Sequence, residues 1–150
     1  MDTAKQIAEY MLSKKPLTPK QVQKLLYYAY ALYLIKYNDC YKKENMNKLF
    51  DDKIERWDHG PVIRNVYDYI KHVAMSNELV TCKAEIKLSS PKIENFIDKI
   101  LKVYGQYSGY QLENLTHSEK PWIVTGRNEV IDDKIIFDYY SEKYKNLGNI

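Results

Sequence analysis

Hydrophobic and polar positions change most sharply across residues 17–37, which read L-T-P-K-Q-V-Q-K-L-L-Y-Y-A-Y-A-L-Y-L-I-K-Y. The first residues predict a helix start, because Thr18 can cap, Pro19 suits the first turn and Gln21 completes a capping box. The first turns have a polar side opposite an apolar stripe. The polar residues expected to face solvent are Lys20, Gln21, Gln23 and Lys24. From residue 25 to residue 35 every side chain is apolar or Tyr, which is typical of a helix buried on all sides. Because a bilayer span needs about 20 apolar residues, the stretch predicts the central helix of a soluble domain.

Shorter helices are predicted around this central helix, from apolar residues at helical spacing and from helix-start signals. Their expected ranges are residues 2–12, residues 91–104 ending at Gly105, a helix capped by Ser108, one turn at 123–127, and a last helix capped by Asp132 with Ile135, Ile136, Tyr139 and Tyr140 inside. Another helix is predicted to begin at Pro61 and to end before Ser76. Its inner stripe would be Val62, Val66, Tyr69, Ile70 and Val73.

One stretch predicts a β-strand, because residues 80–88 alternate between apolar and polar side chains. A strand needs a partner, and residues 53–57 are the first choice, with Ile54 and Trp57 pointing inward. Together these patterns predict a mainly α fold. It would be a compact helical single domain around a buried central helix, with a minor two-stranded β element.

Length and composition fit one globular domain over residues 1–150, with 45% hydrophobic and 29% charged residues. The formal net charge is +3 and the basic residues are spread along the chain, so no nucleic-acid footprint stands out. Cys40 and Cys82 lack ligand-like spacing and are expected to be reduced thiols. No uninterrupted apolar segment begins the chain, so a cytoplasmic location is expected.

Tyrosine is abundant, with 15 residues in the chain. Two interpretations stay open at this stage. The excess can reflect AT-rich coding, which the many Lys, Ile and Asn residues also indicate. It can also mark a binding surface, because Tyr offers a large contact area with a polar tip at low entropic cost.

The histidines His59, His72 and His117 are the first candidates for metal or acid–base chemistry. A zinc site uses three or four ligands at recognisable spacing, and no pair here forms H-x-x-x-H. Ser118 beside His117 resembles a nucleophile only by residue type, and no G-x-S-x-G, P-loop or G-x-G-x-x-G occurs. We therefore expect no catalytic residue, no bound metal or other cofactor, and no enzymatic activity.

Two alternatives keep some support from the residues. A metal-dependent hydrolase would combine His59 and His117, brought together by folding, with a carboxylate such as Glu119. A DNA-binding regulator would use the helix after Pro61, whose polar residues are Arg64, Asn65 and Lys71.

Three motifs occur in a fixed order along the chain: K-L-L-Y-Y-A at 24–29, W-D-H-G-P-V at 57–62 followed by Tyr67, and L-T-H-S-E-K-P-W at 115–122. Their order and spacing resemble the SocA-like antitoxin family, also called the Panacea antitoxin domain, which includes phage-associated GepA-like proteins. The resemblance covers about residues 3–145. It implies the antitoxin of a toxin–antitoxin pair, which neutralises a cognate toxin by direct protein binding. One branch of the family resembles a proteolytic adaptor, so an ATP-dependent protease is a second implied partner.

The motif residues are interpreted first as structural, with Trp57 and Trp122 in the core and Gly60 supplying a positive φ or a close approach. The alternative is a binding groove in which His59 and His117 meet. Tyrosines in loops or at helix ends have little predicted cover and are candidate anchors for a protein partner. The candidate partner-binding residues are Tyr41, His59, Arg64, Tyr107, Tyr110 and His117.

Overall fold

The computed structural model describes residues 1–72 and 77–144. Its helices are α1 (Ala4–Lys14), α2 (Pro19–Lys36), α3 (Arg64–Ile70), α4 (Pro91–Tyr104), α5 (Gly109–His117), α6 (Lys120–Val124) and α7 (Asp133–Tyr144). Strands β1 (Glu55–Trp57) and β2 (Gly60–Val62) form a small antiparallel sheet. The mainly α fold with a two-stranded β element is therefore confirmed.

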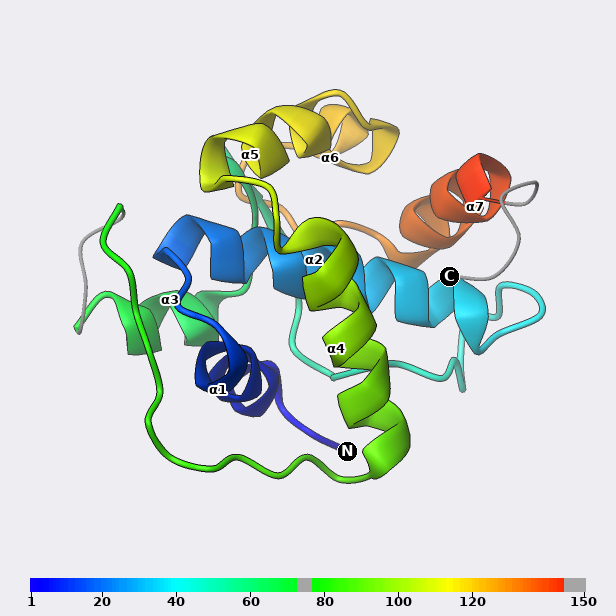
Figure 1. Cartoon of the computed structure of the whole chain (residues 1–150). Helices are drawn as coiled ribbons and strands as arrows, with labels where there is room; N and C mark the ends of the chain where they lie inside the picture. The colour runs from blue at the N-terminus through cyan, green and yellow to red at the C-terminus, as the bar shows by residue number, and fades with distance from the viewer. Residues whose placement is uncertain (73–76, 145–150) are drawn as a thin grey trace.

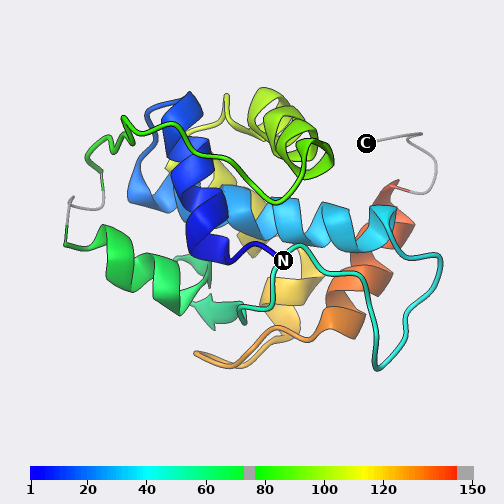
Figure 2. The same ribbon diagram turned by 90° about the horizontal axis from the view of Figure 1, so that it is seen from below.

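Helix α2 lies at the centre, and the other elements are arranged around it (Figures 1 and 2). Its start is the predicted capping box, in which Thr18 and Gln21 exchange side-chain and backbone hydrogen bonds. Helices α1, α3, α4, α5 and α7 and strand β2 all contact it. Every side chain from Val22 to Leu34 is consequently buried. Each fully buried Leu or Val contributes about 1.5–3 kcal/mol, so this helix anchors the hydrophobic core.

The polar side of the first turns of α2 differs from the prediction. Gln23 and Lys24 were expected to face solvent, but their exposed fractions are only 5% and 2%. The hairpin β1–β2 and helix α3 cover this side of the helix, and they supply backbone partners for both polar side chains.

The two strands pair with each other across a tight turn, with Trp57 opposite Gly60 and Glu55 opposite Val62. The predicted pairing of residues 53–57 with residues 80–88 is wrong, because β2 occupies one edge of β1 and Val130 bridges Glu55. Pro61 belongs to β2 and does not begin a helix; α3 begins at Arg64. The last residue of the predicted stripe, Val73, and the predicted end at Ser76 lie outside the described residues.

Residues 81–88 do not form a strand. Val80 makes an isolated bridge with Leu17, and the Cys82 amide donates to the Leu12 carbonyl. The alternating pattern instead reflects an extended segment with one side against helices: Val80 and Leu88 are buried in the core, and Cys82 and Ile86 pack against it. One-sided burial produces a period of two whether or not a neighbouring strand exists.

Several boundaries shift by a few residues, as helix ends commonly do. Helix α1 extends through Lys14, and α6 begins and ends earlier than the helical turn predicted at 123–127, which it overlaps by two residues. Gly105 ends α4 with φ −68°, so this end does not need a left-handed residue. Helix α7 buries Phe137 in place of Ile135, alongside Ile136 and Tyr140. Among the helices described, none is long and apolar enough to cross a membrane.

Candidate functional site

A groove of about 340 Å³ lies where the start of α2 meets the β1–β2 hairpin and α3. Apolar atoms of Trp57, Val62, Tyr67 and Ile70 line it together with Pro19. Its other lining residues are polar or basic: Lys20, Gln23, Lys24, His59 and Lys71. A groove of this size, largely apolar with a few convergent polar groups, is typical of a binding site.

Gln23 fixes the wall of the groove to α2. Its Oε1 accepts a hydrogen bond from the Ile63 amide at 2.8 Å, and its Nε2 donates to the Ile63 carbonyl at 3.1 Å. Ile63 is the residue that precedes α3 and has no side-chain cap of its own. The buried amide therefore satisfies backbone groups that would otherwise be costly to bury. This pair of bonds ties the residue that precedes α3 to helix α2.

Lys24 is buried beneath the H-G-P turn. Its Nζ donates to the Pro61 carbonyl at 3.1 Å, and a Cβ on Gly60 would lie 2.7 Å from its Cε atom. Gly60 has φ +111°, so the predicted positive φ and the predicted close approach are both confirmed. Burial lowers the pKa of the Lys24 ammonium to about 7, although the charge of Glu113 opposes this shift and that of Lys20 adds to it.

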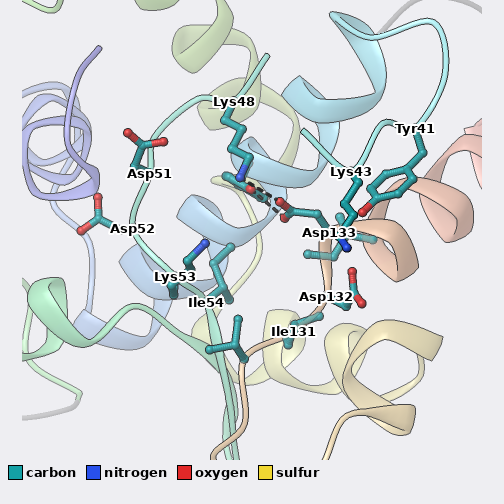
Figure 3. A pocket seen from close by; sticks show the side chains of 13 residues that line it. Tyr41, Lys43, Lys48, Asp51, Asp52, Lys53, Ile54, Ile131, Asp132 and Asp133 are labelled. Carbon is teal, nitrogen blue, oxygen red and sulfur yellow. Dashed lines mark hydrogen bonds and ion pairs between the residues drawn. The ribbon is translucent and has the colours of Figure 1, made fainter. Parts of the chain in front are cut away.

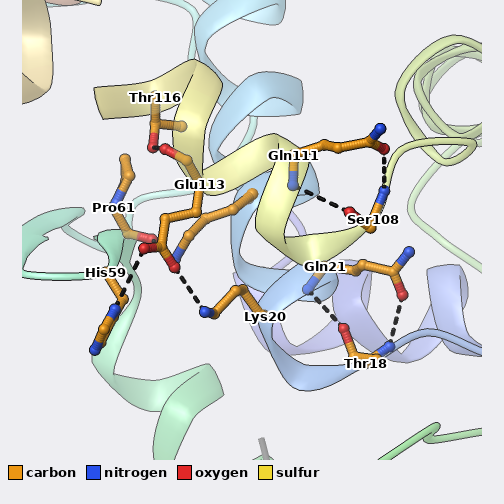
Figure 4. Close-up of polar contacts among 10 residues, drawn as sticks. Thr18, Lys20, Gln21, His59, Pro61, Ser108, Gln111, Glu113 and Thr116 are labelled. Atoms are coloured by element: carbon orange, nitrogen blue, oxygen red, sulfur yellow. Dashed lines mark hydrogen bonds and ion pairs between the residues drawn. The ribbon is translucent and has the colours of Figure 1, made fainter. Parts of the chain in front are cut away.

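Glu113 on α5 connects two basic residues at the edge of the groove (Figure 4). Lys20 Nζ lies 2.6 Å from its Oε1, and His59 Nδ1 lies 3.3 Å from its Oε2. Burial raises the pKa of Glu113, but the contacts with Lys20 and His59 outweigh it and hold the pKa below its usual value. The carboxylate is therefore ionised at neutral pH and neutralises much of the charge of Lys20.

Aromatic rings form the outer wall of the groove. The rings of Trp57 and Tyr67 meet edge to face with centroids 4.9 Å apart, and Tyr67 is 43% exposed. The guanidinium of Arg64 lies 5.4 Å from the centre of the Trp57 ring and pairs with Glu55 at 2.8 Å. Trp57 is thus only partly buried, and its predicted place in the core is wrong.

His59 and His117 do not form a joint site. His59 contacts Glu113, whereas His117 lies over Trp122 with ring centroids 4.1 Å apart. The Nε2 atom of His117 is buried and has no hydrogen-bond partner among the described residues. The Trp122 indole, also only partly buried, donates to the Trp57 carbonyl at 2.9 Å. The third motif therefore holds the hairpin through the hydrogen bond from Trp122 to Trp57.

The residues that a metal-dependent hydrolase or a DNA-binding regulator would use make other contacts in the structure. Glu119 lies in a separate buried cluster, so it does not complete a triad with His59 and His117. In the part of the chain that the structure describes, no three His, Cys, Asp or Glu residues are grouped to hold a metal ion. On α3, Arg64 pairs with Glu55, Asn65 donates to Asp52, and Lys71 pairs with Asp68. Carboxylates therefore already occupy the side chains that would read DNA.

The Glu119 cluster is a buried polar centre that the sequence did not reveal. Glu119 is 2% exposed and accepts hydrogen bonds from the Tyr28 and Tyr140 hydroxyls at 2.5 and 2.9 Å. Lys143 pairs with its other oxygen at 2.5 Å. Burial, followed by the negative charge of Glu119, raises the pKa of Tyr28. The cluster joins α2 to α7 and explains where several of the abundant tyrosines are used.

A second cavity, of about 270 Å³, lies between α2, the loop before β1 and the start of α7 (Figure 3). Tyr41 lines it, with Lys134 Nζ 5.9 Å from the centre of the ring. Its charged residues carry both signs: Lys43, Lys48, Lys53, Asp51, Asp52, Asp132 and Asp133. Lys48 pairs with Asp133 at 3.2 Å, so much of this charge is compensated internally.

Tyr107 and Tyr110 lie beside the start of α2, at the beginning of α5. The Tyr107 carbonyl accepts a hydrogen bond from Gln21, and the backbone of Gly109 approaches the Lys20 side chain. Tyr107 is 40% and Tyr110 69% exposed. Lys20 pairs with Glu113, and Glu113 also contacts His59 at the groove. These tyrosines and the groove therefore lie around the same end of α2.

The family model of the SocA-like antitoxin, Panacea domain, matches residues 22–123. The match begins in the buried part of α2 and includes the hairpin, α3, α5 and most of α6. It covers every residue that lines the groove except Pro19 and Lys20. The chain belongs to this family of antitoxin-like helical proteins. No curated protein and no solved structure matches the chain.

Proposed function

We propose that this protein is an antitoxin that neutralises a cognate toxin by binding it directly. Membership of the SocA-like antitoxin family carries the proposal. A binding role also suits the geometry, because the polar residues of the motifs hold the hairpin in place and leave an apolar groove beside them.

The proposed contact surface surrounds the start of α2. Its apolar centre is the groove with Trp57 and Tyr67, and its margin carries exposed His59, Arg64, Tyr107 and Tyr110. Aromatic residues and Arg commonly act as anchors in protein interfaces. The other two candidates lie outside this surface, Tyr41 at the second cavity and His117 against Trp122, so the proposed contact surface does not include them. Delivery of the toxin to an ATP-dependent protease is a further part of the proposed role, as is action in the cytoplasm.

The decisive experiment expresses the neighbouring reading frame in bacteria, alone and together with this protein. We expect the neighbour to stop growth alone, co-expression to restore growth, and the two proteins to purify as one complex. A frameshifted copy of this gene makes the RNA without the protein, and it serves as the control for rescue by the RNA alone. If growth is not restored and no complex forms with either neighbour, the antitoxin proposal fails.

A protease-deficient host separates the two modes of neutralisation. Rescue that persists without the ATP-dependent proteases supports binding alone. Rescue that disappears there, while the complex still forms, supports delivery of the toxin for degradation.

A further inference from the structure

The charge inside the groove indicates what it binds. Four basic side chains line it, Lys20, Lys24, Lys71 and His59, and among the described residues no Asp or Glu lines it. Three of the four already have a carboxylate partner at its edge: Glu113 for Lys20 and His59, and Asp68 for Lys71.

Lys24 is the exception. Within the described residues its Nζ makes one hydrogen bond, to the neutral Pro61 carbonyl, and no carboxylate lies within ion-pair distance. An ammonium has three N–H donors, so two are unused. A buried charge without a counter-ion is costly, and a carboxylate brought close to it recovers much of that cost.

The other residues that line the groove determine which second chemical group an occupant must have. The walls around Lys24 are the side chains of Trp57, Val62, Tyr67 and Ile70, which favour an apolar or aromatic group. An occupant therefore needs an apolar side chain for the walls and a negative group for the floor.

Resting on the proposed antitoxin role, we propose that the groove binds a segment of the partner protein in which a carboxylate stands next to an apolar side chain. The carboxylate hydrogen-bonds to Lys24 Nζ, and the apolar side chain packs against Trp57 and Tyr67. Binding holds the amine in its ammonium form, so the groove takes up a proton when the segment enters at neutral or higher pH.

The test compares two matched peptides, acetyl-Leu-Asp-Phe-amide and acetyl-Leu-Asn-Phe-amide, on the full chain carrying ¹³Cε-labelled lysine. We expect the Asp peptide to bind at least about fivefold more tightly at pH 6.5, with resonance shifts at Trp57 and Tyr67. That preference should shrink as the pH rises from 6.5 to 8.5, because the Lys24 amine loses its proton and its positive charge over this range. The other charged groups nearby are Glu113, Lys20, His59 and Lys71, and none of them restores the charge of the amine. The Lys24 ¹³Cε titration should move to higher pH with the Asp peptide and stay in place with the Asn peptide.

Variants then assign the effect. Lys24→Met should bind both peptides equally, and Lys99→Met, which removes an exposed charge on α4 outside the groove, should keep the preference. Equal affinity of the two peptides for the parent chain overturns the inference, as does a preference that survives in Lys24→Met or an unmoved Lys24 titration. The titration uses the parent chain, so it decides the matter even if Lys24→Met fails to fold.

The outcome is separate from that of the antitoxin proposal. Rescue of growth without peptide discrimination means that the toxin binds elsewhere and the groove inference is wrong. Peptide discrimination without rescue supports the groove and overturns the antitoxin role.

Discussion

At the scale of single residues, the polar side chains under the hairpin carry most of the information about the site. Gln23 and Lys24 lie one turn after the helix start, where periodicity alone assigns them to solvent. Their burial depends on the Pro61 and Ile63 backbone about 40 positions later, which supplies their partners. No local pattern contains that relation, so the sequence did not predict it. Gly60 was predictable, because a turn before Pro is a place where only glycine tolerates a positive φ.

Replacing Lys24 by Met should stabilise the protein most at low pH. The folded-state pKa of about 7 lies below the unfolded value of about 10.4, so the folded state carries the full cost of a buried charge below pH 7. That cost is relieved as the pH rises from about 7 towards 10. We expect the stability of Lys24→Met relative to the parent to fall by about 2–3 kcal/mol between pH 6 and pH 9, at about 1.4 kcal/mol for each pH unit in that window.

Urea unfolding at the two pH values measures this difference. Lys99→Met, which removes an exposed lysine from α4, is the control and should show almost no change with pH. A relative stability of Lys24→Met that is constant from pH 6 to pH 9 would contradict the burial of a titrating amine.

At the scale of elements, the helices and the place of the first strand were predictable, but the pairing of the strands was not. Start signals such as Thr18 with Gln21, and Ser108 with Gln111, act within one turn and therefore appear in the sequence itself. The alternation at residues 80–88 was stronger than anything in the real hairpin, because an extended segment lying on helices has the same period as a strand. The hairpin has only three residues in each strand, too few for a pattern.

The hairpin turn offers an element-scale test. Gly60→Ala should destabilise the protein by about 2–4 kcal/mol, since its φ of +111° is strained for any side chain and the new Cβ would meet Lys24. For a chain of this size each kcal/mol lowers the melting temperature by about 2–4 °C.

Gly126→Ala is the matched control. There the new Cβ would meet only the carboxylate end of exposed Glu129, which can move away. Its melting temperature should stay within about 2 °C of the parent. Equal melting of the two variants would show that the turn does not need glycine.

At the scale of the whole molecule, the tyrosines divide into two groups. All four on α2 are buried, and Tyr27 and Tyr28 take part in the Glu119 cluster with Tyr140. The exposed ones, Tyr67, Tyr107 and Tyr110, lie near the start of α2, whereas Tyr41 at the second cavity is partly buried and packs against the core. The sequence correctly indicated little cover for Tyr107 and Tyr110, but Tyr41 is partly buried against the core and the exposed Tyr67 was not predicted. It did not indicate which of them share a face, because that depends on the relative positions of α3 and α5.

The proposed surface predicts which tyrosines matter for the toxin. Tyr67→Ala and Tyr110→Ala should each weaken toxin affinity at least about tenfold, equivalent to 1.4 kcal/mol, with melting temperatures within about 4 °C of the parent. Tyr41→Ala should bind normally. Titration calorimetry with the purified toxin gives the affinities, and loss of binding in Tyr41→Ala alone would move the interface to the second cavity.

The Glu119 cluster also has a consequence for the growing chain during synthesis, because its members are far apart in the sequence. Tyr27 emerges from the ribosome 113 residues before Tyr140, to which its hydroxyl is hydrogen-bonded. At about 5–20 residues per second, this interval lasts about 6–23 s. During that time the most apolar helix of the chain lacks its last cover, α7. A nascent or prematurely ended chain therefore exposes a surface that proteases and chaperones recognise, and only a completed chain hides it.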